Sequence, residues 1–185
     1  MEALQPEHAR RRAGVVVVLT GSESTGKSVL ARELAEHYSA TSCSEYVRQY
    51  LDTRGGTLDA TDVEPIALGQ IALEDVHAPA AGALVIQDAD LVSTVVYARH
   101  YYGSCPQWIV DAAVSRRADL YLLMNIDIPW VADPQRDRGH MREAMHALFA
   151  ATLREIGAKY VQIGGNWNQR KRLAIEAIDL TLGKC

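Results

Sequence analysis

Residues 15–28 read VVVVLTGSESTGKS, an unbroken aliphatic run followed at once by a loop that begins and ends near glycines. A continuous apolar run of this length is typical of a strand covered on both faces. A helical pattern follows the loop, so the loop is expected to join a strand to a helix. Its last eight residues match G-x-x-x-x-G-K-S in full, which in this context predicts a phosphate-binding loop.

The residue types of this loop predict how it holds a nucleotide. Glycines let the backbone wrap so that N–H groups face phosphate oxygens, and the next helix adds the positive end of its dipole. Lys27 is expected to reach the β- and γ-phosphates, and Ser28 to place its hydroxyl on Mg²⁺. ATP and Mg²⁺ are therefore the expected cofactors. The expected contacts to the nucleotide are Gly21, Ser22, Glu23, Ser24, Thr25, Gly26, Lys27 and Ser28.

Short apolar runs alternate with longer amphipathic segments along the rest of the chain, which predicts an α/β fold with a parallel sheet. Helical spacing is clearest over residues 141–156, and Thr61 with Glu64 predicts a capping box that opens another helix. No linker interrupts the pattern, so we expect one domain over residues 13–185 after a polar leader, residues 1–12. The strands are expected at residues 14–20, around 42, 83–87, 120–125 and 160–163.

Composition narrows the classes of function. The 185 residues are 48% hydrophobic and 23% charged, with a formal net charge of −4, so neither disorder nor nucleic-acid binding is expected. The apolar runs are too short to span a membrane and no signal peptide is recognisable, which favours a cytoplasmic protein. The three cysteines have no spacing typical of a disulfide framework or a zinc site. The oligomeric state stays open between monomer and homodimer.

Two acids follow the expected strand at residues 83–87, where the sequence reads ALVIQDAD. Asp88 is expected to help hold Mg²⁺, because a carboxylate at a strand end beside a phosphate-binding loop commonly does so. Side chains alternate in an extended segment, so Asp90 can face the same crevice and contact substrate. Asp90 equally fits an N-cap of the helix that follows.

A second acid lies in SEYVRQY, after the short strand near residue 42. In a small-molecule kinase, Glu45 at this edge of the sheet would accept the proton of the substrate hydroxyl, and Arg48 would orient it. Taken alone, the segment fits an ion pair on a surface helix equally well.

Two further loops are candidate parts of the site. The segment PWVADPQRDRGH, residues 129–140, fits a lid in which Arg136, with Arg138, stabilises charge on the transferred phosphoryl group. A solvated loop is the alternative. The segment IGGNW follows the last strand, so Gly165 and Asn166 are expected to border the adenine, whereas Trp167 fits core packing as well.

Six segments together resemble the ribosylnicotinamide kinase domain of the NadR type, within the P-loop kinase superfamily. They read GSESTGKS, SEYVRQY, IALGQIALED, QDADLVSTVVYARHYYG, ADLYLLMNIDIPWVADPQRDRG and YVQIGGNW. The resemblance implies a three-layer sandwich with a five-stranded parallel sheet of order 2-3-1-4-5, helices on both faces and a lid loop. It also implies phosphorylation of the 5′-hydroxyl of nicotinamide riboside to nicotinamide mononucleotide, a step of NAD salvage. By resemblance, Lys27, Glu45, Asp88 and Arg136 are the catalytic residues. Glu45 is the expected general base, and an exchange of roles between Glu45 and Asp88 is the alternative.

Two features depart from that family. Its longer members carry an adenylyltransferase domain and often a DNA-binding module ahead of the kinase, and neither is expected in these 185 residues. Ser44 stands where better-known members have an aromatic residue suited to stacking on the nicotinamide ring. Either Tyr46 or Trp130 supplies that face, or the substrate is another nucleoside.

Two other functions fit the same motifs. One is an ATPase or sensor whose bound state is reported to a protein partner, which requires no acceptor pocket. The other is a kinase for a different small acceptor, such as a nucleotide or a sugar, which would require further arginines to hold an anion.

Overall fold

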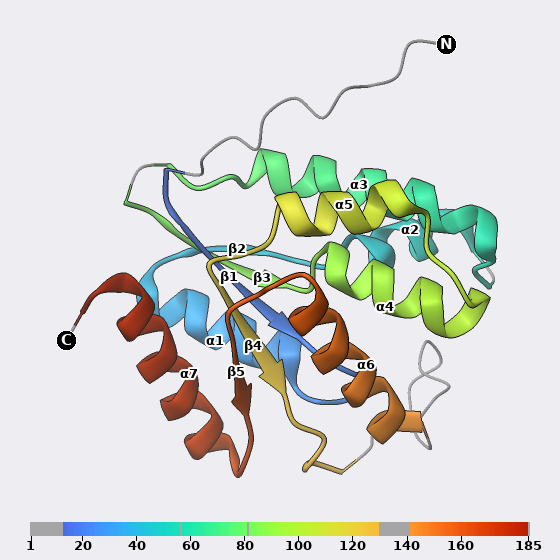
Figure 1. Ribbon diagram of the computed structural model, residues 1–185. Helices are drawn as coiled ribbons and strands as arrows, with labels where there is room; N and C mark the ends of the chain where they lie inside the picture. The colour runs from blue at the N-terminus through green and yellow to red at the C-terminus, as the bar shows by residue number, and fades with distance from the viewer. Residues whose placement is uncertain (1–12, 56, 81, 130–140, 185) are drawn as a thin grey trace.

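The computed structural model describes residues 13–55, 57–80, 82–129 and 141–184. Five strands form one sheet in the order β2-β3-β1-β4-β5, and every neighbouring pair is parallel (Figure 1). The predicted fold class and strand order are therefore confirmed. The strands are β1 (Val15–Thr20), β2 (Thr41–Cys43), β3 (Leu84–Asp88), β4 (Leu120–Met124) and β5 (Tyr160–Ile163).

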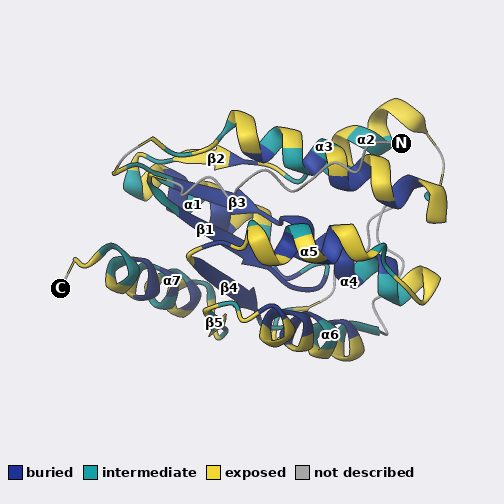
Figure 2. Cartoon of the chain, turned by 45° about the horizontal axis from the view of Figure 1, so that its top comes forward, coloured by how far each residue is buried: buried dark blue, intermediate teal, exposed yellow. Residues whose placement is uncertain are grey.

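Helices cover both faces of the sheet and make a three-layer molecule. They are α1 (Lys27–Tyr38), α2 (Tyr46–Arg54), α3 (Val63–Val76), α4 (Leu91–Tyr102), α5 (Gln107–Ser115), α6 (Arg142–Glu155) and α7 (Trp167–Leu182). Buried side chains of α1 and α7 pack on one face of β1 and β4, and those of α4 and α6 pack on the other. A third cluster joins α3, α4 and α5 beside the sheet. Burial is greatest in the strands and on the inward sides of the helices (Figure 2).

Alternation along β1 explains how one short strand serves both layers. Val17 and Leu19 belong to the core shared with α1 and α7, whereas Val16 and Val18 belong to the core shared with α4 and α6. Side chains of a strand point to opposite faces in turn, so a central strand must be apolar throughout. Val15 to Leu19 of the run VVVVLT meet this requirement.

The predicted helix over residues 141–156 is confirmed as α6, with its apolar stripe turned inward. The predicted capping box at Thr61 and Glu64 is wrong. The box is formed by Asp59 and Asp62 around a 3₁₀ turn, residues Ala60–Asp62, where Asp59 Oδ1 accepts the Thr61 N–H at 2.8 Å. The chain therefore enters α3 through a tighter turn, and Glu64 instead accepts the Trp108 indole N–H at 2.9 Å.

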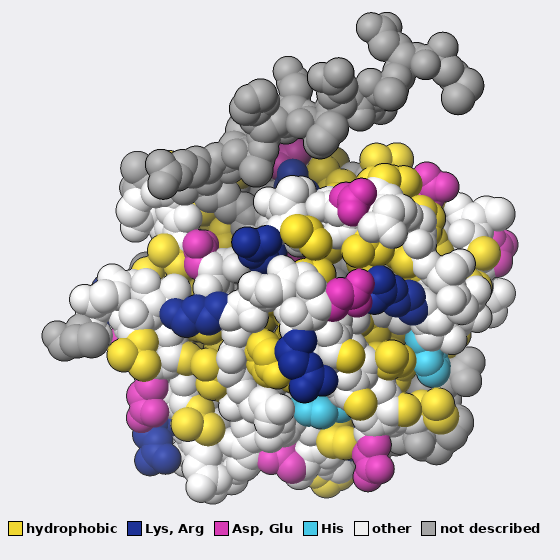
Figure 3. Space-filling model, in the orientation of Figure 1, with side chains coloured by type: hydrophobic (Ala, Val, Ile, Leu, Met, Phe, Trp, Pro, Cys, Tyr) yellow, Lys and Arg dark blue, Asp and Glu magenta, His cyan; other side chains and the backbone are white. Residues whose placement is uncertain are grey.

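The described part of the chain has neither a membrane-spanning helix nor, on the face shown in Figure 3, a surface patch of one charge. No helix within it combines the length and the apolar character needed to cross a membrane. On the face shown in Figure 3, acidic and basic side chains are interspersed and do not form a patch of one sign.

Candidate active site

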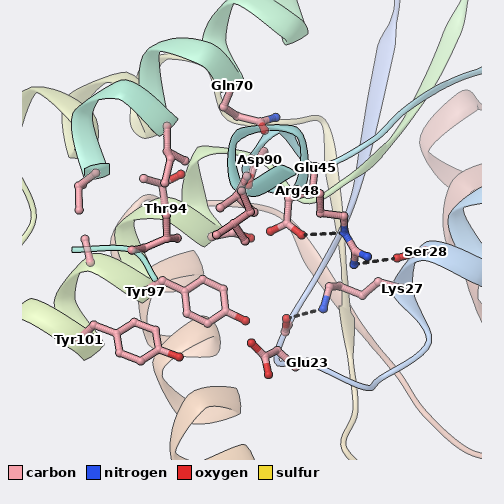
Figure 4. Close-up of a pocket in the computed structure, with 18 of the residues that line it drawn as sticks. Glu23, Lys27, Ser28, Glu45, Arg48, Gln70, Asp90, Thr94, Tyr97 and Tyr101 are labelled. Carbon is pink, nitrogen blue, oxygen red and sulfur yellow. Dashed lines mark hydrogen bonds and ion pairs between the residues drawn. The ribbon is translucent and has the colours of Figure 1, made fainter. Parts of the chain in front are cut away.

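A cavity of about 550 Å³ opens at the carboxyl edge of the sheet. Ligands of open α/β sheets bind at this edge, because the loops that follow parallel strands converge there. The cavity is lined by the loop after β1, the start of α2, the segment that leads into α3, and one side of α4. Figure 4 shows the polar groups of the loop and of α2 projecting into it together with rings from α4.

The loop between β1 and α1 has the backbone that its glycines predict. Gly21 and Gly26 have φ values of 124° and 84°, in the left-handed region that favours glycine. A Cβ at Gly26 would lie 3.0 Å from the ring of Trp167, so a larger residue would also be crowded there. Gly26 provides no side-chain cap for α1, which leaves the N-terminus of this helix suited to an anion.

Lys27 lies at the centre of the charges in the cavity. Its Nζ donates to the carbonyl oxygens of Gly21 and Ser22 at 2.9 and 2.8 Å, so it closes back on the loop. Burial lowers the pKa of Lys27, against the carboxylates of Glu45 and Asp88, which raise it.

Asp88 ends β3 and is 6% exposed, and it does not line the cavity itself. Its Oδ1 is buried and has no hydrogen-bond partner among the described residues. A buried carboxylate oxygen of this kind is costly unless a cation or donor meets it. The Asp88 carboxylate and the Ser28 hydroxyl are oxygen groups of the kind that Mg²⁺ prefers. Within the described ranges, no three acids, histidines or cysteines lie together as a metal cage.

Glu45 directly precedes α2 and makes no hydrogen bond that caps this helix. Its carboxylate lies 3.6 Å from Arg48 Nε, and the other end of the guanidinium donates to the Ser28 hydroxyl at 3.4 Å. Burial raises the pKa of Glu45, and Asp88 raises it further, whereas Lys27 and Arg48 act in the opposite direction. A carboxylate with a raised pKa is a stronger base, which suits proton abstraction from a hydroxyl.

The carboxylate of Asp90 caps α4, as one of the two interpretations of the sequence predicts. Its Oδ1 accepts the Val92 N–H at 3.0 Å and so caps α4, and its Oδ2 accepts the Tyr121 hydroxyl at 2.6 Å. It also lines the cavity. The cap fixes Asp90 in place at the wall of the cavity.

The structure places Tyr46 elsewhere than the sequence predicts. Its ring packs against α3 at Gly69, where a Cβ would overlap the ring, and it is not among the residues lining the cavity. Tyr97, Tyr101 and Tyr102 of α4 line the cavity instead, and the rings of Tyr97 and Tyr101 stack at 6.1 Å with 17° between their planes. Helical spacing of these tyrosines in VVYARHYYG was the available signal, but it does not say which face of the helix meets a ligand.

Gly165 and Asn166 do not line this cavity. The Gly165 N–H donates to Asp127 Oδ2 at 2.5 Å, and Asn166 caps α7. Both are tied to the phosphate-binding loop through Arg170, which sequence analysis missed. Arg170 is fully buried and donates to the carbonyls of Gly165, Thr25 and Asn125 at 2.9, 3.1 and 3.2 Å, and to the Asp127 carboxylate. Its sequence context, NQRKR, resembles a solvated helix face, so nothing distinguished it.

Three candidates cannot be placed in this site. Trp130, Arg136 and Arg138 lie outside the described residues, as does the leader, residues 1–12.

Known proteins similar to this chain agree with its fold. A family model described as AAA domain matches residues 16–170. The trifunctional NAD biosynthesis/regulator protein NadR of Salmonella typhimurium is 31% identical over 153 residues, which cover 80% of this chain and 37% of that protein. The chain therefore spans little more than a third of this curated relative.

Two solved structures of NadR match the fold closely. One, in complex with NR, has a TM-score of 0.72 and 27% identity and covers 92% of this chain and 52% of its own. Another, in complex with NAD and AMP-PNP, has a TM-score of 0.70 and 26% identity. This match covers 92% of this chain and 50% of the NadR chain. The predicted resemblance to the NadR type is thereby confirmed.

Proposed function

This chain belongs to the AAA domain family, and we propose that it transfers the γ-phosphate of ATP to the 5′-hydroxyl of nicotinamide riboside, forming nicotinamide mononucleotide. One observation carries the proposal. Glu45 lines the same cavity as Lys27, so an acid able to accept a hydroxyl proton lies beside the phosphate-binding lysine. The complexes of NadR with NR and with AMP-PNP support the two substrates.

The part of the cavity lined by Gly21 and residues 23–28, which we call the donor half, is suited to a triphosphate. Backbone N–H groups of the loop and the start of α1 would hold the phosphates, and Lys27 would turn from the loop carbonyls to the β- and γ-phosphates. Ser28 and Asp88 would hold magnesium, which neutralises charge between the β- and γ-phosphates when bound. Arg136, which lies outside the described residues, is proposed to contact the transferred group.

The part of the cavity lined by Glu45, Arg48 and α4, which we call the acceptor half, supplies the general base. The ribose O5′ attacks the γ-phosphorus, the bond to the bridging oxygen of ADP breaks, and the hydroxyl proton passes to Glu45. Arg48 spans Glu45 and Ser28, so it couples the position of the base to the end of the phosphate loop. This geometry acts chiefly by positioning, which accounts for most of the catalysis in phosphoryl transfer.

The lining of the acceptor half favours a cationic ring. Tyr97 and Tyr101 present aromatic faces, and Glu23 and Asp90 add carboxylates to the same space (Figure 4). A pyridinium ring gains from aromatic faces and from negative charge. The tyrosines of α4 thus take the role for which Ser44 is unsuited.

The alternatives fit the cavity less well. A nucleotide sensor needs no space beyond the phosphate loop, yet the cavity continues along α2 and α4. An anionic acceptor would need several arginines, but Arg48 is the only arginine among the described lining residues, and Arg99 is paired with Glu155 at 2.6 Å. A cytoplasmic location accords with the use of ATP.

A transfer assay tests the proposal directly. The protein is incubated with ATP labelled at the γ-phosphate, Mg²⁺ and a panel that holds nicotinamide riboside, uridine, cytidine, adenosine and ribose. We expect label in nicotinamide mononucleotide, and loss of that product in Lys27→Ala. If no compound of the panel is labelled by a protein that still binds ATP, the kinase assignment is contradicted. If only another nucleoside is labelled, that nucleoside is the acceptor in place of nicotinamide riboside.

A further inference from the structure

The first N–H groups of helix α2 need hydrogen-bond partners from outside the helix, because no carbonyl within a helix reaches them. Glu45, the residue ahead of the helix, makes no side-chain capping bond. The N–H of Tyr46 is instead accepted by Gln70 Oε1 at 3.0 Å, from α3, 24 positions later in the chain. The carboxylate of Glu45 is thereby left to face Lys27 and Arg48.

Gln70 is held in one orientation by its neighbours. It is 3% exposed, and its Nε2 donates to Glu74 Oε1 at 3.2 Å. A carboxylate accepts and cannot donate, so the amide NH₂ faces Glu74 and the amide oxygen must face Tyr46. Glu74 is fixed in turn by Arg116, whose Nε donates to its Oε2 at 3.1 Å. A chain of directed bonds thus runs from Arg116, at the end of α5, to the backbone beside Glu45.

A second contact holds the same point of α2. The ring of Tyr46 packs on α3 at Gly69, where any side chain would overlap it. Gly69 and Gln70 are neighbours in α3, so this helix contacts both the side chain and the backbone of Tyr46. This double contact leaves little freedom to the peptide that carries Glu45.

We propose that Gln70 is a positioning residue for the base: by binding the Tyr46 N–H, and itself oriented by Glu74 and Arg116, it sets where the Glu45 carboxylate stands relative to Lys27. This inference rests on the proposed function, in which Glu45 is the base. Gln70 and Glu45 line the same cavity, so a shift of α2 at its first residue moves the carboxylate within the site. Lys27, Asp88 and Arg48 are the charged groups that act on it there.

Gln70→Met tests the proposal, because methionine keeps the length of the side chain and loses both hydrogen bonds. We expect kcat to fall by roughly 10- to 100-fold, as a misplaced catalytic group does, with the KM for ATP changed less than about 2-fold. Gln49→Met, on the exposed side of α2, is the matched control and should keep both constants. An unchanged kcat in a folded Gln70→Met protein overturns the proposal.

An exchange of the two side chains separates positioning from folding. Gln70→Glu alone sets two carboxylates against each other and should be poorly active. In Gln70→Glu combined with Glu74→Gln, residue 70 again accepts from Tyr46 and residue 74 again accepts from Arg116, so kcat should recover at least about 10-fold. If the double variant is no better than Gln70→Glu alone, the proposed chain of bonds is wrong. This comparison holds even if Gln70→Met does not fold.

Titration of Glu45 by carboxyl-carbon NMR needs no turnover, and Glu45→Gln assigns its signal. We expect the pKa of Glu45 to lie above its ordinary value in the wild type and to move down towards it in Gln70→Met, as the carboxylate meets more water. An unmoved titration overturns the inference whatever the acceptor is. If the wild type forms no nicotinamide mononucleotide, or Glu45→Gln keeps its full rate, the proposed function fails instead.

Discussion

Glu45, Asp88 and Lys27 are placed where their charges act on one another more strongly than in water. Burial disfavours the charges of Glu45 and Lys27, so the pKa of Glu45 is raised and that of Lys27 is lowered, and neither charge is fully compensated by the other. Groups held in this way are common in active sites, where function and stability oppose each other. The consequence can be measured at Glu45.

Glu45→Gln should stabilise the protein at neutral pH. A raised folded pKa means that the folded state keeps its proton while the unfolded chain loses it near the ordinary value of 4.5. The folded state therefore binds more protons in the window above 4.5, and stability falls as pH rises through it. Glutamine does not titrate and so removes that loss. The melting temperature of the Glu45→Gln protein should therefore exceed that of the wild type at pH 7, and the two should converge at pH 4. A lower melting temperature at pH 7 would contradict the account.

Tyr97 is expected to bind the acceptor and not the donor. Tyr97→Leu removes an aromatic face worth about 1 kcal/mol or more towards a cationic ring, so the KM for nicotinamide riboside should rise roughly 5- to 10-fold. The KM for ATP should stay within about 2-fold. Initial rates with each substrate varied in turn provide the measurement, and an equal rise in both constants would place the ring elsewhere.

Among the elements, the phosphate loop depends on the loop after β5 and the start of α7. Trp167 packs against Gly26 and donates its indole N–H to Glu33 at 3.1 Å, and Arg170 binds the carbonyl of Thr25. Arg170 also joins the ends of β4 and β5 to this loop. The donor site is therefore a junction of three loops that are far apart in the sequence.

Gly26→Ala tests that junction. The substitution meets a φ of 84° and the ring of Trp167 at 3.0 Å, so we expect a loss of roughly 2–3 kcal/mol in the free energy of unfolding and weaker ATP binding. Gly82→Ala is the control, because φ is 75° there and nothing lies within 4 Å of the new Cβ. Urea unfolding measures both. Equal losses would mean that the contact with Trp167 contributes nothing.

What the sequence predicts at the level of elements follows from local rules. The strands and α6 were predicted because their apolar spacing is a property of the segment itself, and Lys27 and Ser28 because the loop's backbone fixes their spacing. The capping box was displaced because a 3₁₀ turn precedes α3. Arg170, Gln70 and the tyrosines of α4 escaped prediction, since their roles arise only when distant helices meet.

For the molecule as a whole, the parallel sheet gathers the site at one edge. β1 lies at the centre of the order β2-β3-β1-β4-β5, with β3 and β4 on its two sides. The phosphate loop therefore has Asp88 at the end of one neighbour and the Arg170 junction at the end of the other. Strand order, which local patterns do not fix, came only with the family resemblance.

Ligands that bind the folded chain should stabilise all of it. AMP-PNP with Mg²⁺ at about 100 times its Kd should raise the melting temperature by roughly 5–10 °C, which corresponds to about 2.7 kcal/mol. Removal of Mg²⁺ with a chelator, or Asp88→Asn, should reduce the shift. A shift that is the same with and without Mg²⁺ would remove Asp88 and Ser28 from the proposed magnesium site.

The central claim is that one cavity joins a phosphate donor to a nucleoside hydroxyl through Glu45. Parallel quantification of ADP and nicotinamide mononucleotide, from wild type and Glu45→Gln supplied with ATP, Mg²⁺ and nicotinamide riboside, tests it most directly. The account predicts equal amounts of the two products from the wild type and rates at least about 100-fold lower for the variant. ADP formed without nicotinamide mononucleotide, or a variant as fast as the wild type, would contradict it.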